Sequence, residues 1–471
     1  MGALTHEPDV LAGLRVGVYG SGGAPWPHAA FAALFGARVR TVRAEDVAAG
    51  RLDELDVLIV PGGGRVAMHG LLAPLGRDGV ATIRRWVEDG GTYLSSCAGS
   101  VLPLALEGAA AELLPATAEL RLSTARLANP GDATLGGLAS PGVGVIRVTV
   151  DSTSPLARGV PSDVELIHYN GPFFALDEED DRTTSFARPI EATEGFTPAE
   201  RFLPRGETEV GTTFDRCVAR GAAGAVVAEV GRGRAVLFGS HPEFGFGPLL
   251  LGWGEGAALL RNALADAPRA GGDVAGDGPW RRDPARTGRT PAELADAVAS
   301  AFERVAVGFA RLQAHDDAAW LEGDASPTFL GTGPRVAWRR DRVAAETVAR
   351  EVAASWREAA AVASDADLPW LDDRPRPDQD VGAMGLLQLA EQAEDALAAA
   401  ERGASDGPEP LAHAYDGLDQ HPFHLAVGSY LSAAGLVAGA ALQTATAAAL
   451  QGRPLGPLGR RLFATESTEA G

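Results

Sequence analysis

The 471-residue sequence contains no lysine and only two cysteines, Cys97 and Cys217. Its 41 basic residues are therefore all arginine, and 62 acidic residues bring the formal net charge to -21. This balance argues against a nucleic-acid partner, because binding a phosphate backbone needs a concentrated basic face. Two cysteines in a chain of this length also exclude a disulfide framework, so free thiols are expected.

A secretion signal is not seen either, since the first residues lack a basic region followed by a long apolar one. With 46% apolar and 22% charged residues, the composition is typical of a soluble globular protein, and we expect a cytoplasmic location. The absence of lysine, with much Ala, Gly, Arg and Asp, indicates a high-GC prokaryotic genome. One uncharged run, 425–450, is long enough to span a membrane. Its Ser, Thr, Gln and Ala content favours a buried bundle helix instead, and no membrane partner is predicted.

The length predicts at least two domains. From 14 to 106, short apolar runs alternate with helical patterns in the order strand, helix, strand, strand, helix, strand. This order is typical of an α/β fold, and we expect a flavodoxin-like, doubly wound, mostly parallel sheet in domain 1–267. Residues 107–240 look richer in strands. They end in a hairpin with its turn at Gly231, Arg232 and Gly233 that leads to His241, and a helix over 248–267 closes the domain.

The second half of the chain reads differently. Residues 268–289 are rich in Gly, Pro, Asp and Arg without periodicity, which predicts a linker. Beyond it, Thr290 and Glu293 form a capping-box pattern with Pro291 at the first helical position. Further apolar periodicities predict an all-α helical bundle over 290–460. Its role is not indicated, although it could supply the surface for a protein partner.

Three glycine-containing turns follow predicted strands: GSGG at 20–23, PGGG at 61–64 and CAGS at 97–100. Ligands of parallel sheets bind at the carboxyl ends of the strands, so these turns are expected to border one site. A strand that ends in Cys97, with a small residue, a glycine and a helix after it, is typical of a nucleophile elbow. The start of the helix favours the reactive thiolate.

The other parts of a cysteine site also have candidates. His241 is the expected base, and Glu243 is placed to orient its imidazole. Backbone N–H groups of Ala98 and of Gly63 or Gly64 could stabilise an oxyanion. Ser21 and Gly22 are expected to line the substrate pocket. A dinucleotide fingerprint at Gly20, Gly22 and Gly23 is incomplete, since Pro25 stands where its last glycine would be, and no cofactor is predicted.

The motifs IVPGGG, GGTYLSSCAGS and GSHPE, in this order, resemble the class I glutamine amidotransferase-like superfamily. HYNGPFF and VGRGRAVLFGSHPEFG are most similar to the N-terminal domain of eukaryotic-type biotin-protein ligases and its stand-alone bacterial relatives. The likeness covers roughly residues 14 to 265. It implies Cys97 as nucleophile, His241 as base and Glu243 as its orienting group, and it adds Tyr169 and Asn170 to the expected pocket. Ser95 departs from the usual glycine two residues before the nucleophile, and the second half lacks the biotin-ligase catalytic pattern.

The expected activity is therefore that of an amidase or amidotransferase-like hydrolase, in which Cys97 forms a thioester with a small amide. The alternative is a catalytically silent regulatory module that binds a ligand or partner in the same pocket. Cys217 has no such context and is expected to be structural. His413, Asp416, His421 and His424 could form a metal site, but His421 precedes a proline that begins a helix, so capping is the simpler role. No metal is predicted.

Overall fold

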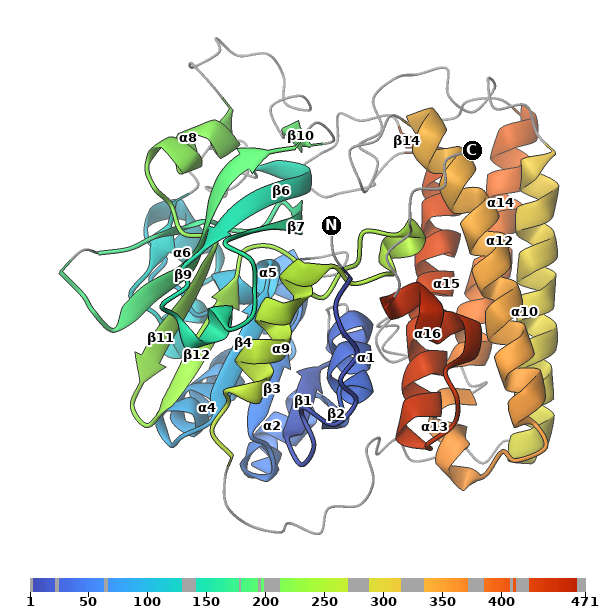
Figure 1. Cartoon of the computed structure of the whole chain (residues 1–471), viewed down its shortest axis with the longest axis horizontal. Helices are drawn as coiled ribbons and strands as arrows, with labels where there is room; N and C mark the ends of the chain where they lie inside the picture. The colour runs from blue at the N-terminus through green and yellow to red at the C-terminus, as the bar shows by residue number, and fades with distance from the viewer. Residues whose placement is uncertain are drawn as a thin grey trace. The chain divides into compact units, whose positions relative to one another are not determined.

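The chain forms two compact units, which are described separately (Figure 1). An α/β unit comprises the described residues of 3–244 and 253–269, and a helical unit comprises Gly245–Gly252 and the described residues of 288–463. The computed structural model describes residues 3–21, 25–62, 67–128, 141–177, 179–193, 196–198, 212–269, 288–314, 334–371, 385–406, 410–411 and 423–463.

Five parallel strands form one half of the main sheet. In spatial order they are β2 (Arg38–Val42), β1 (Arg15–Tyr19), β3 (Val57–Val60), β4 (Thr92–Ser96) and β12 (Gly233–Phe238). Taken in chain order, this is the 2-1-3-4-5 arrangement of flavodoxin-like sheets. The predicted α/β class is therefore confirmed, and the carboxyl ends of β3, β4 and β12 lie next to one another.

Antiparallel strands extend the same sheet beyond β12. β11 (Ala225–Val230), β9 (Thr183–Ala192) and β6 (Gly142–Val150) follow in that order, and β6 also pairs with β7 (Asp163–Tyr169) and β10 (Thr197–Pro198). The predicted hairpin is confirmed: Val230 pairs with Gly233 across the turn, and Gly231 adopts a φ of 61°. A separate short ladder joins β5 (Arg126–Leu127) to β8 (Phe174–Ala175).

Helices cover both faces of the central parallel strands, and β3, with the sequence VLIV, is buried at every position, as expected for a strand covered on both faces. On one face, Leu58, Val60, Tyr93 and Leu237 pack in one core with Ile83, Trp86 and Val87 of α4 (Gly76–Glu88). The alternate residues Val57, Ile59, Leu94 and Val236 are equally inaccessible to solvent. The other helical segments of the unit are α1 (Trp26–Leu34), α2 (Ala44–Ala48), η1 (Arg51–Glu54), α3 (Ala67–Leu72), α5 (Ala98–Val101), α6 (Gly108–Leu113), α7 (Thr117–Leu120), η3 (Pro155–Ala157), α8 (Thr213–Ala219), η6 (Glu255–Ala257) and α9 (Ala258–Ala265).

The closing helix is shorter than the sequence pattern predicts. The pattern favours a helix over 248–267, but α9 begins only at Ala258. Leu249, Leu250 and Gly252 have positive φ values of 60°, 58° and 88°, and a run of left-handed residues cannot continue a right-handed helix. The expectation of one helix over this range is therefore wrong.

Four long helices make up most of the helical unit. α10 (Pro291–Gln313) packs against α12 (Pro334–Ala359) and α14 (Leu386–Asp406), and α15 (Leu425–Leu450) packs against α12 and α14. The capping box is confirmed, since Thr290 Oγ1 accepts from the Glu293 N–H at 3.3 Å and Glu293 Oε2 accepts from the Thr290 N–H at 2.7 Å. Shorter elements are η5 (Pro248–Leu250), η7 (Asp365–Asp367), α13 (Leu368–Leu371), α16 (Gly456–Phe463) and the paired strands β13 (Pro410–Leu411) and β14 (Phe423–His424).

The uncharged run at 425–450 forms α15. Within it, Ser432–Leu450 is long and apolar enough to cross a membrane, and 72% of the most apolar window is buried inside the fold. Trp356 of α12 donates its indole N–H to Thr444 Oγ1 of α15 at 3.0 Å. Burial and polar contacts of this kind are typical of a core helix in a bundle.

Candidate active site

Cys97 occupies a sharp turn between β4 and α5. Its backbone has a φ of 47° and a ψ of -120°, a conformation that costs a residue with a side chain roughly 1–3 kcal/mol. Surrounding hydrogen bonds hold this conformation in place. The Cys97 N–H donates to the Phe238 carbonyl at 2.9 Å, the Tyr93 hydroxyl donates to the Gly99 carbonyl at 2.8 Å, and the Ser100 hydroxyl donates to Phe238 at 2.8 Å. The turn thus has the geometry of a nucleophile elbow, with the thiol partly exposed.

Gly99 allows α5 to lie directly against the end of β3. A Cβ at this position would lie 2.2 Å from the Val60 carbonyl oxygen and 2.7 Å from that of Pro61. These oxygens belong to the backbone and cannot move away cheaply. The glycine after the elbow is therefore required by the close approach of two chain segments.

We expect Gly99→Ala to destabilise the α/β unit by about 3 kcal/mol, since the overlap must displace backbone. Gly108→Ala is the matched control, because Gly108 has open space around it and a φ of 57°, so only local strain of about 1 kcal/mol is introduced. Hydrogen exchange of peptides from β3 and β4 measures the effect. Equal destabilisation by the two variants would contradict this packing argument.

His241 lies three residues beyond the end of β12 and is held from both sides. The backbone N–H of His241 donates to the Ile167 carbonyl of β7 at 2.8 Å, and the imidazole ring stacks on the Phe244 ring with 4.4 Å between centroids. The ring Nδ1 lies 2.7 Å from Glu243 Oε1. Glu243 is itself held by a hydrogen bond from the Trp253 indole to its carbonyl at 2.8 Å. The base and the orienting carboxylate named from the sequence therefore form a buried pair.

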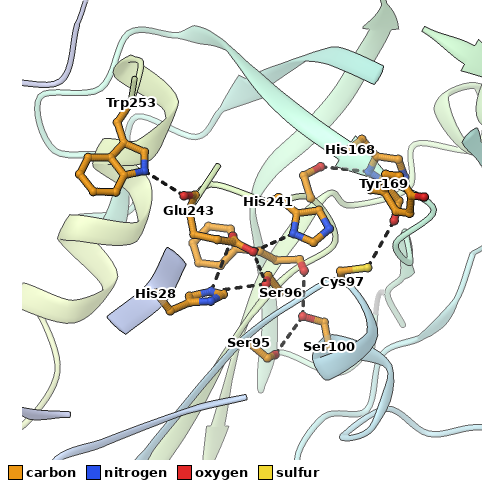
Figure 2. Close-up of polar contacts among 12 residues, drawn as sticks. His28, Ser95, Ser96, Cys97, Ser100, His168, Tyr169, His241, Glu243 and Trp253 are labelled. Atoms are coloured by element: carbon orange, nitrogen blue, oxygen red, sulfur yellow. Dashed lines mark hydrogen bonds and ion pairs between the residues drawn. The ribbon is translucent and has the colours of Figure 1, made fainter. Parts of the chain in front are cut away.

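The His241 ring lies beside Cys97 (Figure 2). A Cβ built on Gly62 would lie 3.0 Å from His241 Cε1 and 3.4 Å from Cys97 Cβ, so the same glycine packs against both side chains. The thiol itself donates to the Tyr169 carbonyl at 3.3 Å. Nε2 of His241 is buried and has no hydrogen-bond partner among the described residues.

The charges of the site favour a protonated His241. Burial works against the charged ring, but the Glu243 carboxylate and the Cys97 sulfur outweigh it and raise the pKa of His241 to about 10. Burial likewise opposes the Glu243 carboxylate, yet His28 and His241 lower the pKa of Glu243 to about 2. An anionic carboxylate beside a protonated imidazole is the arrangement that stabilises a neighbouring thiolate.

Four residues of the site were not identified from the sequence. Ser96 donates to Glu243 Oε1 at 2.8 Å, and His28 Nε2 lies 3.6 Å from Glu243 Oε2. His168 is fully buried, with Nδ1 3.1 Å from Ser240 Oγ, and burial together with the charge of His241 lowers its pKa to about 3. Gly62 belongs to the PGGG turn that the sequence singled out, whereas no local pattern pointed to the two histidines.

The remaining candidates are placed as follows. Ala98 begins α5, so its N–H has no acceptor inside the helix. Gly22, Gly63 and Gly64 lie outside the described residues. Ser21 follows the end of β1, two strands from β4, and no described contact joins it to Cys97.

The expected pocket residues Tyr169 and Asn170 lie at the end of β7. Tyr169 contacts the thiol through its carbonyl, as described above. Asn170 has a φ of 52° and donates its N–H to Gly142 at 2.9 Å. Its Oδ1 is buried without a hydrogen-bond partner in the described part of the chain. This segment thus lies close to the sulfur.

Cys217, the second cysteine, is completely buried in α8. The histidines considered for a metal site lie mostly outside the described residues, and His424 alone of the four candidates is placed, in β14. Within the described ranges, no group of three or more His, Cys, Asp or Glu side chains is arranged to hold a metal ion.

Comparison with known proteins gives structural matches only. The sequence matches no family model and no curated protein. A protein described as a component of GMP synthase from Thermoplasma acidophilum is 15% identical, with 53% of this chain and 92% of that chain covered and a TM-score of 0.32. PurLQS from Thermotoga maritima is 16% identical, with 53% of this chain and 97% of that chain covered and a TM-score of 0.33. The cytoplasmic protein STM3548 from Salmonella typhimurium is 14% identical, with 55% of this chain and 100% of that chain covered and a TM-score of 0.34. At these identities and TM-scores the matches carry no conclusion about the chemistry of this chain, which rests on the geometry of its own site.

Proposed function

We propose that the α/β unit is a cysteine-dependent amidase or amidotransferase-like hydrolase that acts on a small amide. The observation that carries the proposal is the elbow: Cys97, held at a φ of 47°, lies beside a His241 ring whose Nδ1 is 2.7 Å from Glu243. Strained cysteines at a strand-to-helix turn, with a base and an oriented carboxylate, are suited to nucleophilic catalysis.

The reaction follows from these groups. His241 takes the thiol proton, and the Cys97 thiolate attacks the amide carbonyl carbon to give a tetrahedral intermediate. The ring then returns the proton to the leaving nitrogen, the C–N bond breaks, and ammonia or an amine departs from a thioester. His241 next deprotonates a water, which attacks the thioester, and the acid leaves while the thiol is re-formed. Glu243 keeps the ring in the required orientation throughout.

The N–H of Ala98 is suited to stabilise the negative oxygen of the intermediate, since it lies at the free start of α5 next to the nucleophile. A second donor from Gly63 or Gly64 remains a prediction. Tyr169 and Asn170 are proposed to border the substrate pocket, as they lie at the end of β7 next to the sulfur. No cofactor or metal is needed by this scheme.

The family placement is part of the same proposal. The flavodoxin-like strand order and the elbow at the end of the fourth strand support a class I glutamine amidotransferase-like domain. The motifs favour the branch that includes the N-terminal domain of biotin-protein ligases. We further propose that domain 1–267 and the bundle 290–460 are separate domains, with a partner surface on the bundle.

Limited proteolysis tests this domain division. We expect cleavage within the predicted linker 268–289, because its Gly- and Pro-rich composition without periodicity is typical of the exposed segments at which proteases cut. Two folded fragments, identified by mass spectrometry, are the expected result. Cleavage confined to other segments would contradict the proposed boundary.

Alkylation tests the activated nucleophile directly. Iodoacetamide at pH 6 should label Cys97 faster than a free cysteine of the same concentration, since a neighbouring imidazolium favours the reactive thiolate. Peptide mapping locates the label and separates it from Cys217. A Cys97 that reacts no faster than the free thiol would overturn the proposal.

A second function has an observation in its favour. The Cys97 thiol donates to the Tyr169 carbonyl. Nε2 of His241 therefore has no hydrogen bond from the thiol in the described structure. This arrangement suits a catalytically silent module that binds a ligand or partner in the same place. Rapid alkylation without release of ammonia from glutamine or other small amides would favour this binding module.

A further inference from the structure

Among the described residues, the Glu243 carboxylate has three buried polar neighbours, His241, Ser96 and His28, which come from separate parts of the α/β unit (Figure 2). His241 Nδ1 and Ser96 Oγ lie 2.7 Å and 2.8 Å from Oε1. His28, in the first turn of α1, places Nε2 3.6 Å from Oε2 and 3.4 Å from Ser96 Oγ. The side chains of His28 and Glu243 are only 1% and 2% exposed.

Holding this carboxylate in one orientation matters for the base. A glutamate has three side-chain torsions, and its two oxygens can exchange places unless both are held. Oε1 receives two hydrogen bonds, whereas Oε2 is buried and, among the described residues, makes no hydrogen bond within normal distance. The charged Oε2 is costly to bury without a partner, and among the described residues His28 Nε2 lies 3.6 Å from it.

We propose that His28 is a positioning residue: its Nε2 lies against both Ser96 Oγ, at 3.4 Å, and Glu243 Oε2, at 3.6 Å, and with Ser96 it keeps Oε1 on the imidazole of His241. This inference rests on the proposed function, because it assigns a role within the same site. His28 does not touch the reacting atoms. It acts through Glu243, in the way that outer residues orient the ligands of a metal or the base of a triad.

The protonation states agree with this role. Burial lowers the pKa of His28, against the pull of Glu243 and with the added repulsion of His241, and this direction favours the neutral ring. The titratable groups that face this cluster are Glu243 and His241 after β12, Cys97 at the elbow and His168 on β7. A neutral ring that donates through Nε2 adds no second positive charge beside His241.

The test compares two variants of His28, of which one keeps a hydrogen-bond donor near Glu243 and the other does not. His28→Leu removes the N–H donor, and His28→Gln keeps an N–H group near the position of Nε2. Thr117→Ala is the matched control, since it removes a buried hydrogen bond of 2.7 Å to Leu114 elsewhere in the unit. The rate of Cys97 alkylation is measured from pH 5 to pH 10, with thermal melting to follow stability.

We expect His28→Leu to slow alkylation at pH 6 about tenfold and to move the rise of the profile to higher pH, as for loss of one hydrogen bond to a charged group. His28→Gln should stay within about twofold of the wild type, and Thr117→Ala should leave the profile unchanged whatever it does to melting. A pH profile of alkylation in His28→Leu that coincides with that of the wild type overturns the proposal. Alkylation of Cys97 that is as slow in His28→Gln as in His28→Leu also overturns it.

Nitrogen NMR of the ring of His241 makes the test independent of cysteine chemistry. The pKa of His241 should fall by about one unit in His28→Leu and hold in His28→Gln. A wild-type Cys97 without enhanced reactivity would count against the proposed function alone, while the pKa of His241 would still decide the role of His28. If His28→Leu does not fold, His28→Asn replaces it, because the shorter amide is withdrawn from Glu243. An unchanged pKa of His241 in that variant overturns the proposal.

Discussion

Cys97→Ser is expected to lower the release of ammonia from the amide substrate by at least about a thousandfold. Serine has nearly the same shape as cysteine, so the elbow and its hydrogen bond from the Cys97 position to the Phe238 carbonyl should persist. The hydroxyl is far harder to ionise than a thiol, however, and His241 is set up to pair with a thiolate. The measurement is coupled detection of ammonia with glutamine and a panel of small primary amides.

Cys217→Ser provides the matched control, because the second cysteine is fully buried in α8, where its thiol donates to the Ala128 carbonyl at 3.6 Å. This control should keep the activity of the wild type wherever it folds, as judged by circular dichroism. Substantial turnover by Cys97→Ser would show that another group is the nucleophile. Absence of turnover in the wild type, with Cys97 still reactive, would favour the silent binding module.

His241→Ala should slow alkylation of Cys97 at pH 6 by about a hundredfold. An ordinary cysteine titrates near pH 8.5, so only about 0.3% of it is thiolate at pH 6. In the wild type, Glu243 and Cys97 overcome burial and raise the pKa of His241 to about 10, so the ring stays protonated at pH 6 and supports a thiolate. Because the pKa of His241 is raised to about 10, the ring stays protonated through neutral pH, and this support is lost as the pH rises through about 10.

Glu243→Gln is the graded comparison for this prediction. The amide can still hold the His241 ring but no longer contributes the negative charge, so reactivity should fall less than on removal of the imidazole. Alkylation rates from pH 5 to pH 10, measured by mass spectrometry of the Cys97 peptide, give the profile of each variant. A profile of His241→Ala equal to that of the wild type would mean that His241 does not act on the thiol.

Much of the framework could be predicted from local sequence patterns. The alternation of short apolar runs with helical patterns indicated a parallel α/β sheet, and the hairpin around Gly231 and the capping box at Thr290 were found as expected. These features depend on residues a few positions apart, for which propensity and hydrogen bonding are decisive. The prediction of one helix over 248–267 was wrong, because apolar periodicity does not reveal the left-handed backbone of Leu249 and Leu250.

The turn at Cys97 could also be predicted without a structure, because a strand, a cysteine, small neighbours and a helix form a contiguous signal. The proximity of His241 and Glu243 to it agrees with the sequence hypothesis, while their catalytic roles stay a prediction. The contacts around these three residues could not be predicted in this way. His28 of α1 and Ser96 of β4 lie against the Glu243 carboxylate, His168 of β7 lies against Ser240, and Gly62 packs against both Cys97 and His241. No local pattern records such contacts, since they arise when the parallel sheet brings the carboxyl ends of distant strands together and buries the charges that meet there.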